Sequence, residues 1–336
     1  MVRRRTVPPR RLLNAVSRSL PVFSLLFPSI KPRDETLAPD ALVKPNAAPA
    51  PLHDTLRRFA LATGVLTLGF SLPLYDLVRF ALRSQLYSHI VLIPFISGYL
   101  IWLNRKTLPS RYVADPGIAS LPMIFGVMAL AGYWLTVGLG IKLPHEDRLA
   151  LTTASYVLLL GGLGGWFLGR ELLCAIVFPV AFLCFMVPMP VFMTNGIETF
   201  LQHGSAEVAY MLYSLAGTPV FRQELVFQLP GITLQVAPEC SGIHSTLALF
   251  ITSLLAGHFF LRSPVKRWVL ALAVIPLALL RNGFRVFVIG ELCVHISPDM
   301  IHSYIHRKGG PIFFALSLVP FAILLIYLRR WDQRKV

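Results

Sequence analysis

The chain has 336 residues, of which 55% are hydrophobic and only 14% are charged, and its mean hydropathy is +0.65. Soluble globular proteins carry about 25% charged residues, so this chain cannot cover a folded surface with polar groups and needs lipid around it. The same composition excludes a disordered protein, a coiled coil and a collagen, and four cysteines are too few for a disulfide scaffold. The net charge of +15 could also indicate nucleic-acid binding, and the positions of the basic residues decide whether it does.

The first 58 residues differ from the rest of the chain. They hold eleven Lys and Arg residues, with Pro and Ala clustered between Ala38 and Pro51, and no sustained helical period of apolar residues. A segment of this kind cannot bury enough apolar surface to fold alone. We therefore expect residues 1–58 to be a mostly disordered cytoplasmic tail, and not a secretory signal, because no compact apolar core with a cleavage site follows the first arginines.

Long segments with almost no charge follow, each near the ~20 residues that a helix needs to cross a ~30 Å hydrocarbon core. They predict an all-α polytopic membrane protein with about eight transmembrane helices. Residues 59–330 form the predicted transmembrane domain, and residues 331–336 form a second cytoplasmic tail. The predicted spans lie near residues 59–78, 86–104, 118–140, 150–168, 172–189, 242–261, 268–290 and 310–328.

An even number of spans puts both termini on one side of the membrane. On that side lie 22 of the 31 Lys and Arg residues, against 7 on the other, and Arg281 and Arg285 remain within a span. Basic residues accumulate on the cytoplasmic side of membrane proteins. The asymmetry predicts that both termini are cytoplasmic and explains the positive charge without nucleic acid.

The longest predicted outer segment, residues 190–239, divides into two parts. Its first half has apolar residues at helical spacing, which predicts an amphipathic helix lying on the outer interface. These residues are Ile197, Leu201, Val208, Met211 and Leu215. Its second half alternates around Pro230-Gly231, which predicts a short β-hairpin before the sixth span.

Chemistry-bearing residues gather in the last third of the chain. Charged side chains are costly inside a membrane. Arg281 and Arg285 lie four residues apart on one helix face, so we expect them to have a structural or functional role there. Arg285 falls near the outer end of its predicted span, Cys240 opens the preceding span at its outer end, and His306 stands just before the last span. The predicted topology therefore brings Cys240, Arg285 and His306 to one face of the membrane.

These three side chains make an acyl-transfer set. The Cys240 thiolate would be the nucleophile. The His306 imidazole would take the thiol proton and later protonate the leaving amine. The guanidinium of Arg285, always charged, would stabilise the developing oxyanion.

Other interpretations of the same residues remain open. Cys240 could be a buried structural thiol, and Cys293 could be a rival thiol or a disulfide partner for it. Arg285 could extend to the outer headgroups, and His302, four before His306, could be the base. His302 and His306 lack the Glu of a His-Glu-x-x-His motif, so we predict no metal site and no cofactor.

The residues around Cys240, Arg285 and His306 have supporting roles in the acyl-transfer interpretation. Glu239 could bind substrate or cap the helix, Ser241 is a disfavoured rival nucleophile, and His244 lies one turn past Cys240. Arg281, one turn deeper than Arg285, is expected to pair with a carboxylate or with carbonyl groups.

Four ordered elements resemble the motifs of a known family. They are Leu229-Pro230-Gly231; Pro238-Glu239-Cys240-Ser241-Gly242-Ile243-His244-Ser245; Asn282-Gly283-Phe284-Arg285-Val286; and His306 followed by Gly309-Gly310. In this order they resemble the exosortase/archaeosortase family of polytopic membrane cysteine transpeptidases and proteases. The resemblance is strong over about residues 190–330.

The resemblance implies Cys240 as nucleophile, Arg285 as oxyanion stabiliser and His306 as general acid and base. It also adds Gly242 and Asn282 to the supporting set of Glu239, Ser241, His244, Arg281 and His302. Two positions depart from the family pattern, which usually has Arg where this chain has His244 and often an acidic residue where it has Arg307. These departures bear on the substrate subclass more than on the reaction.

The implied function is cleavage of C-terminal sorting signals (a short motif, a membrane helix and a basic tail) from exported proteins, through a thioester. The implied location is the bacterial inner membrane, with the active site facing the periplasm, and a glycolipid or polysaccharide is a candidate acceptor. The alternative is a transporter or permease for a lipid-linked or anionic substrate, in which Arg281 and Arg285 bind the anion. A non-enzymatic assembly scaffold is the third hypothesis.

Overall fold

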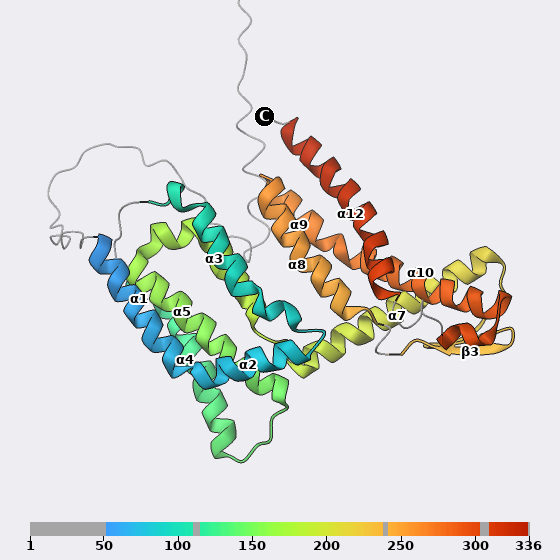
Figure 1. The fold of residues 1–336 in the computed structure, drawn as a ribbon, viewed down its shortest axis with the longest axis horizontal. Helices are drawn as coiled ribbons and strands as arrows, with labels where there is room; N and C mark the ends of the chain where they lie inside the picture. Colours follow the sequence, from blue (N-terminus) through green and yellow to red (C-terminus); the bar gives the residue numbers. More distant parts are fainter. Residues whose placement is uncertain (1–51, 110–114, 238–240, 303–308, 335–336) are drawn as a thin grey trace, which may run out of the picture. The chain divides into compact units, whose positions relative to one another are not determined.

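The computed structural model describes residues 52–109, 115–237, 241–302 and 309–334, which are mostly helical with one small sheet (Figure 1). The chain divides into two units, Met1–Ala48 and Pro49–Val336, and the described residues belong to the second. The predicted disorder of the tail therefore falls largely outside the described residues. Helix α1 begins at Leu52, inside the segment that the sequence assigns to the tail.

The first half of the described chain is a group of packed helices. Helices α4 and α5 lie against each other, and Ser155 on α5 donates its hydroxyl to the carbonyl of Gly126 on α4 at 2.8 Å. The elements are α1 (Leu52–Gly69), α2 (Ser71–Arg83), η1 (Ser88–Val91), α3 (Ile93–Leu103), η2 (Arg105–Thr107), α4 (Pro116–Gly138), α5 (His145–Ala175), α6 (Val177–Phe182) and η3 (Leu183–Met186).

The second half contains the sheet and the helices that surround the predicted site. The elements are α7 (Val191–Ala216), β1 (Phe221–Gln223), β2 (Val226–Leu229), β3 (Ile232–Gln235), α8 (Ile243–Phe260), α9 (Pro264–Leu272), α10 (Val274–His295), η5 (Pro298–His302) and α12 (Gly310–Gln333). Asp147 on α5 accepts a hydrogen bond of 2.8 Å from the backbone of Val191, which fixes the start of α7 to the first half.

The membrane character of the fold is confirmed. Five helical segments are long and apolar enough to cross a bilayer, namely α4, α5, α8, α9 with α10, and α12. The bent pair of α1 and α2 (69°) and that of α6–η3 and α7 (90°) raise the number to seven. Only 11% of the apolar window of α4 is buried inside the protein, so lipid must cover the rest.

The predicted count of eight spans depends on one further segment. The helical residues Ser88–Leu103 coincide with the predicted span at 86–104 but are shorter than a full crossing. Eight spans therefore remain a prediction, while the all-α polytopic fold is established for the part of the chain that the structure describes.

A helix and a hairpin are present where they were predicted, and the sheet has one strand more than predicted. Helix α7 covers Val191–Ala216, and the hairpin around Pro230-Gly231 is formed by β2 and β3. Gly231 has φ of 82°, the left-handed conformation that such a tight turn requires. The additional strand β1 pairs antiparallel with β2, so the sheet order is β1-β2-β3.

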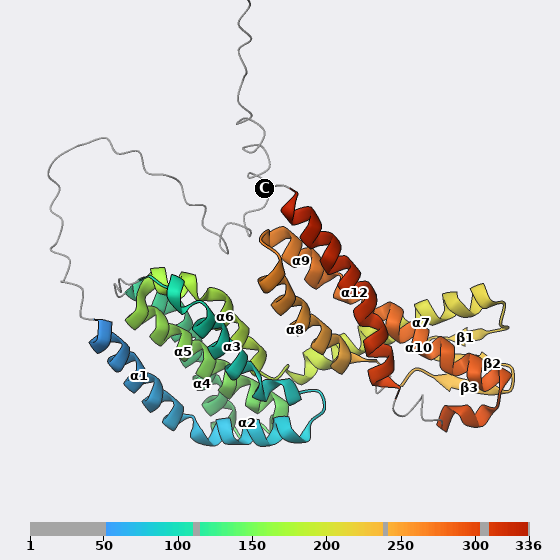
Figure 2. The same ribbon diagram turned by 45° about the horizontal axis from the view of Figure 1, so that its top comes forward.

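The sheet is anchored by one apolar face against α7 and α10 (Figure 2). Alternate residues of β2 and β3 point into this core, as the period of two in a strand requires. The buried members are Ala206, Ala209, Tyr213, Phe227, Leu229, Leu234 and Val236. The Tyr213 hydroxyl donates to the carbonyl of Val286 at 2.9 Å, which connects α7 to α10 inside the same core.

Candidate functional site

Of the three predicted catalytic residues, Arg285 is the one that the structure describes. It lies half-buried on α10, one turn beyond Arg281. Cys240, Glu239 and His306 lie outside the described residues, and of His302 the backbone ends the short helix η5. The description of the site therefore rests on Ser241 and Gly242, which follow Cys240, and on α10, which carries Arg281 and Arg285.

The two residues that follow Cys240 form a tight turn into α8. Gly242 is the N-cap of α8 and has φ of 70° and ψ of 20°, a left-handed conformation that side chains other than glycine rarely adopt. A Cβ atom at this position would also overlap the side-chain amide of Asn282. Ser241, 1% exposed, is buried beneath the turn. Both conformation and space therefore require glycine at residue 242.

Arginine and asparagine side chains from α10 hold this turn. The Asn282 side-chain amide donates to the carbonyl of Ser241, and Arg281 Nη2 donates to the carbonyl of Gly242 at 3.2 Å. Arg281 Nη2 also lies 3.1 Å from the hydroxyl of Thr246 and 3.2 Å from Asn282 Oδ1. Arg281 and Asn282 are 7% and 3% exposed. The expectation that Arg281 binds carbonyl groups is confirmed.

The carbonyl of Gly242 accepts hydrogen bonds from several side chains. It accepts hydrogen bonds from the hydroxyls of Ser245 at 3.0 Å and Thr246 at 2.8 Å, in addition to the one from Arg281. Several donors on one partly buried carbonyl restrict the conformations that the turn can adopt. The backbone immediately after the predicted nucleophile is thus rigid.

The order of these contacts fixes how α8 and α10 lie. Asn282 contacts Ser241, whereas the preceding residue, Arg281, contacts the later Thr246. The two helices therefore run antiparallel here. Arg285 lies four residues beyond Arg281, about 6 Å further along α10, in the direction of the residues that precede Ser241.

Close packing against α7 fixes α10 in this position. A Cβ atom at Gly283 would meet Val208 Cβ at 2.5 Å and the carbonyl oxygen of Ser205 at 3.0 Å. The backbones of α7 and α10 can approach so closely because residue 283 has no side chain. Residues 281–283 thus supply, in sequence, two polar groups for the turn and one contact surface for α7.

Two residues near the turn were not predicted from the sequence. Thr246 accepts from Arg281, and its position one helical turn after Gly242 was the available signal. His89 in η1 has its Nδ1 3.1 Å from the carbonyl of Leu86 and interacts electrostatically with His244. Nothing in the sequence around His89 connects it with α8. His244 itself is exposed on the first turn of α8.

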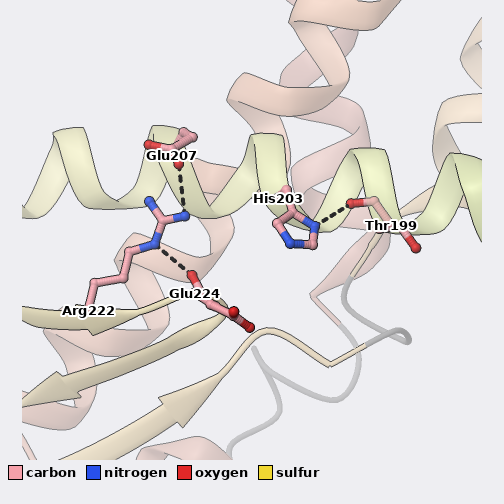
Figure 3. Close-up of polar contacts among 5 residues, drawn as sticks. All are labelled: Thr199, His203, Glu207, Arg222 and Glu224. Atoms are coloured by element: carbon pink, nitrogen blue, oxygen red, sulfur yellow. Dashed lines mark hydrogen bonds and ion pairs between the residues drawn. The ribbon is translucent and has the colours of Figure 1, made fainter.

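An exposed ionic contact connects the sheet to α7 (Figure 3). Arg222 on β1 donates from Nη2 to Glu207 Oε1 at 2.9 Å and from Nε to the carbonyl of Glu224 at 2.7 Å. His203 lies one turn before Glu207 and contacts the carbonyl of Thr199 at 2.9 Å. Arg222 also lies over the ring of the core residue Phe227, 5.7 Å from its centroid, so the ionic contact holds the β1–β2 turn against α7 on the same side of the sheet as the buried core.

A cavity elsewhere does not belong to this site. It has a volume of about 380 Å³, lies among α1, α2, α4 and α5, and includes Asp76, Trp134, His145 and Arg148 in its wall. None of the predicted site residues lines it. Among the described residues, no group of three or more His, Cys, Asp or Glu side chains could hold a metal ion.

Comparison with known proteins identifies the family of the chain. No curated protein and no solved structure matches the chain. A family model described as transmembrane exosortase (Exosortase_EpsH) matches residues 79–323, which include α8, α10 and the turn between Ser241 and Gly242. The match extends over well more than half of the sequence, and the chain belongs to the transmembrane exosortase family.

Proposed function

We propose that this protein is a membrane-embedded cysteine transpeptidase or endopeptidase that cleaves the C-terminal sorting signal of exported proteins. Membership of the exosortase family supports a role in processing such signals. The observation that carries the proposal for this chain is the clamp on Ser241 and Gly242, the residues after Cys240, by Arg281 and Asn282. A nucleophile needs a fixed backbone more than a structural thiol does.

The proposed reaction proceeds through a thioester. The Cys240 thiol gives its proton to the His306 imidazole, and the thiolate forms a bond to the scissile carbonyl carbon. Arg285 stabilises the resulting oxyanion because its guanidinium carries a permanent charge in a partly water-excluded site. The carbon–nitrogen bond then breaks, and the imidazolium protonates the leaving amine, which departs with the helix and tail of the signal.

The second half of the reaction restores the thiol. Water or an acceptor amine attacks the thioester carbonyl and gives its proton to His306, and the thiolate leaves and takes that proton back from the imidazolium. A glycolipid or polysaccharide bearing an amine is the acceptor in the transfer version of the reaction. Glu239, His244 and His302 are proposed to line the substrate path, whereas Ser241, Gly242, Arg281 and Asn282 hold the turn.

The proposed location is the inner membrane, with both termini in the cytoplasm and the α8 N-terminus facing the periplasm. The distribution of basic residues supports this orientation. Lys266 and Asp332, 2.8 Å apart, put the α8–α9 turn and the C-terminal end of α12 at one end of the bundle, as the topology requires.

The alternative as an anion transporter receives less support. Such a protein needs intramembrane arginines that face a cavity. Three of the donor contacts of Arg281 go to Gly242, Thr246 and Asn282 within the protein, and the cavity of about 380 Å³ contains neither Arg281 nor Arg285.

The test is processing of a co-expressed, epitope-tagged exported protein that ends in a short motif, one apolar helix and an Arg-rich tail. Cys240→Ala, Arg285→Ala and His306→Ala should abolish cleavage, while Cys184→Ala, an exposed thiol on η3, should leave it intact. Full processing by Cys240→Ala would refute the mechanism. No cleavage in any variant, together with an Arg285-dependent transport activity that Cys240→Ala retains, would favour the transporter instead.

A further inference from the structure

We propose that the residues preceding the scissile bond of the sorting signal bind as an additional parallel strand on the free edge of β3. This inference rests on the proposed function, because it describes how the same site receives its peptide. The strand would hydrogen-bond to the backbone of Thr233 and Gln235. Extended peptides bind several kinds of protein in this manner, by adding a strand to an exposed sheet edge.

The register of the sheet identifies which backbone groups face the edge. Val236 N donates to the carbonyl of Leu225 at 2.9 Å, so this pair is hydrogen-bonded. Hydrogen-bonded and non-hydrogen-bonded pairs alternate in an antiparallel ladder, so Leu234 with Phe227 and Ile232 with Leu229 are hydrogen-bonded as well. Thr233 and Gln235 must then direct their N–H and C=O groups away from β2.

This edge is unoccupied by any described strand. The sheet order β1-β2-β3 leaves β3 with β2 as its strand partner. Both Thr233 and Gln235 are exposed, and neither backbone has a hydrogen-bond partner on the edge side within the described ranges. Two residues with outward N–H and C=O groups can bind one strand of a peptide through up to four backbone hydrogen bonds.

The opposite edge of the sheet offers less. On β1, Phe221 and Gln223 face β2 because their partners, Gln228 and Val226, are the β2 residues that point away from β3. Arg222 alone directs its backbone outward there, and its side chain is held by Glu207. The β3 edge therefore offers two residues with outward-facing backbone groups, against one on the β1 edge.

The sheet is rigid enough to act as a template. Leu234 and Val236 are buried in the core with α7 and α10, so β3 cannot shift without opening that core. A strand added beside β3 would alternate its own side chains between the α7–α10 side and the exposed side, following the pleat. Backbone contacts would supply affinity, and the side chains facing the α7–α10 side would supply specificity.

The direction in which the sorting signal must run toward Cys240 favours a parallel over an antiparallel strand. Cys240 follows five residues after Gln235, the last residue of β3, and α8 begins at Ile243. A sorting signal runs from its motif into its membrane helix, so a parallel strand delivers its C-terminal end toward the start of α8. An antiparallel strand would place that end beside Gly231, roughly 13 Å away at ~3.3 Å per residue.

Proline substitutions test the edge directly. Thr233→Pro and Gln235→Pro remove an outward N–H and block a neighbouring strand, while the hydrogen bonds to β2 stay, and sheet edges tolerate proline. Each should process the tagged sorting-signal protein at least about tenfold more slowly than Thr233→Val or Gln235→Val, which keep the N–H group. Gln228→Val, exposed on the central strand, serves as the control for the sheet surface.

Equal processing by the proline and valine variants would overturn strand addition. The proposed function has a separate readout, because Cys240→Ala must block cleavage in the same assay. If Cys240→Ala blocks cleavage and both proline variants cleave at the valine rate, strand addition alone fails. If Cys240→Ala cleaves normally, the proposed function fails first.

Photo-crosslinking keeps the inference testable should a proline variant not fold. A benzophenone amino acid at residue 235 of the full-length Cys240→Ala protein should crosslink the uncleaved tagged signal in membranes. The same group at Gln223, exposed on the far strand β1, should not. Equal crosslinking from both positions, or none from residue 235, would overturn the proposed binding mode.

Discussion

Asn282 on α10 donates its side-chain amide to the carbonyl of Ser241, the residue that follows Cys240 in the chain. The two residues are 41 positions apart in sequence and both are buried, so the contact connects two membrane helices in the interior. A polar bridge of this kind costs little where it is satisfied and much where one partner is removed. It connects α10 to the residue that follows the predicted nucleophile in the chain.

Asn282→Ala tests this bridge. The substitution leaves the Ser241 carbonyl without its donor, and we expect a loss of about 1–3 kcal/mol of stability together with at least a tenfold loss of signal processing. Thermal unfolding in detergent and cleavage of the tagged substrate measure the two effects. Asn195→Ala, exposed on α7, should change neither. Normal processing by Asn282→Ala would show that the bridge does not position Cys240.

Gly242→Ala tests the turn itself. A left-handed conformation costs a residue with a side chain about 1–2 kcal/mol, and the new methyl group would also overlap the Asn282 amide. Gly217→Ala is a matched control, because Gly217 has a similar φ of 76° with open space around it. We expect Gly242→Ala to be the more destabilised of the two by thermal unfolding, and to be inactive.

A double substitution separates the two causes of this effect. Asn282→Ala in the Gly242→Ala background removes the overlap but not the backbone strain. The double variant should therefore be more stable than the sum of the two single losses predicts. Simple additivity of the two losses would mean that the side chains do not compete for the same space.

Arg281→Lys tests whether charge alone suffices at this position. Lysine keeps the positive charge but lacks the planar set of donors that reaches Gly242, Thr246 and Asn282. We expect at least a tenfold fall in processing and a changed pH dependence of Cys240 alkylation, because the turn would lose its fixed geometry. Arg79→Lys, exposed on α2, is the control. An unchanged alkylation profile would leave Arg281 with a purely structural role.

Much of the fold follows from the sequence because lipid imposes simple constraints. The charge-free runs predict the long spans α4, α5, α8 and α12, and the positions of Cys240 and the arginines predict that α8 and α10 meet. The contact between Arg281 and carbonyl oxygens was also predicted, since a buried cation must find acceptors.

The details of the turn could not be predicted in the same way. The strand β1 has only three residues, and its contact with α7 through Arg222 is one that no local sequence pattern encodes. The bend after Gly69 lies inside the predicted span at 59–78, where the sequence resembles one straight apolar segment, whereas the bend before Val191 coincides with the predicted boundary at residues 189–190, beside Pro188 and Pro190. The requirement for glycine at residue 242 could not be predicted either, because it depends partly on Asn282, which occupies the adjacent space in the folded protein.

The far end of the bundle provides a test that should spare the chemistry. Asp332 accepts from Lys266 Nζ at 2.8 Å and from the backbone N–H of Arg262 at 2.6 Å, which fastens the end of α12 to the α8–α9 turn. This contact lies at the opposite end of α8 from Gly242, about 27 Å away for an 18-residue helix. Asp332→Asn should therefore lower the thermal midpoint more than Glu171→Gln, an exposed control, does.

Processing per folded molecule should be unchanged in Asp332→Asn, because the clamp on Ser241 does not depend on the far end. Combining it with Lys266→Met should cost less than the sum of the two single losses, since each substitution breaks the same ion pair. A specific loss of processing in Asp332→Asn at full stability would mean that the two ends of α8 are mechanically coupled. The rigid clamp at Gly242 would then be insufficient to fix the position of Cys240.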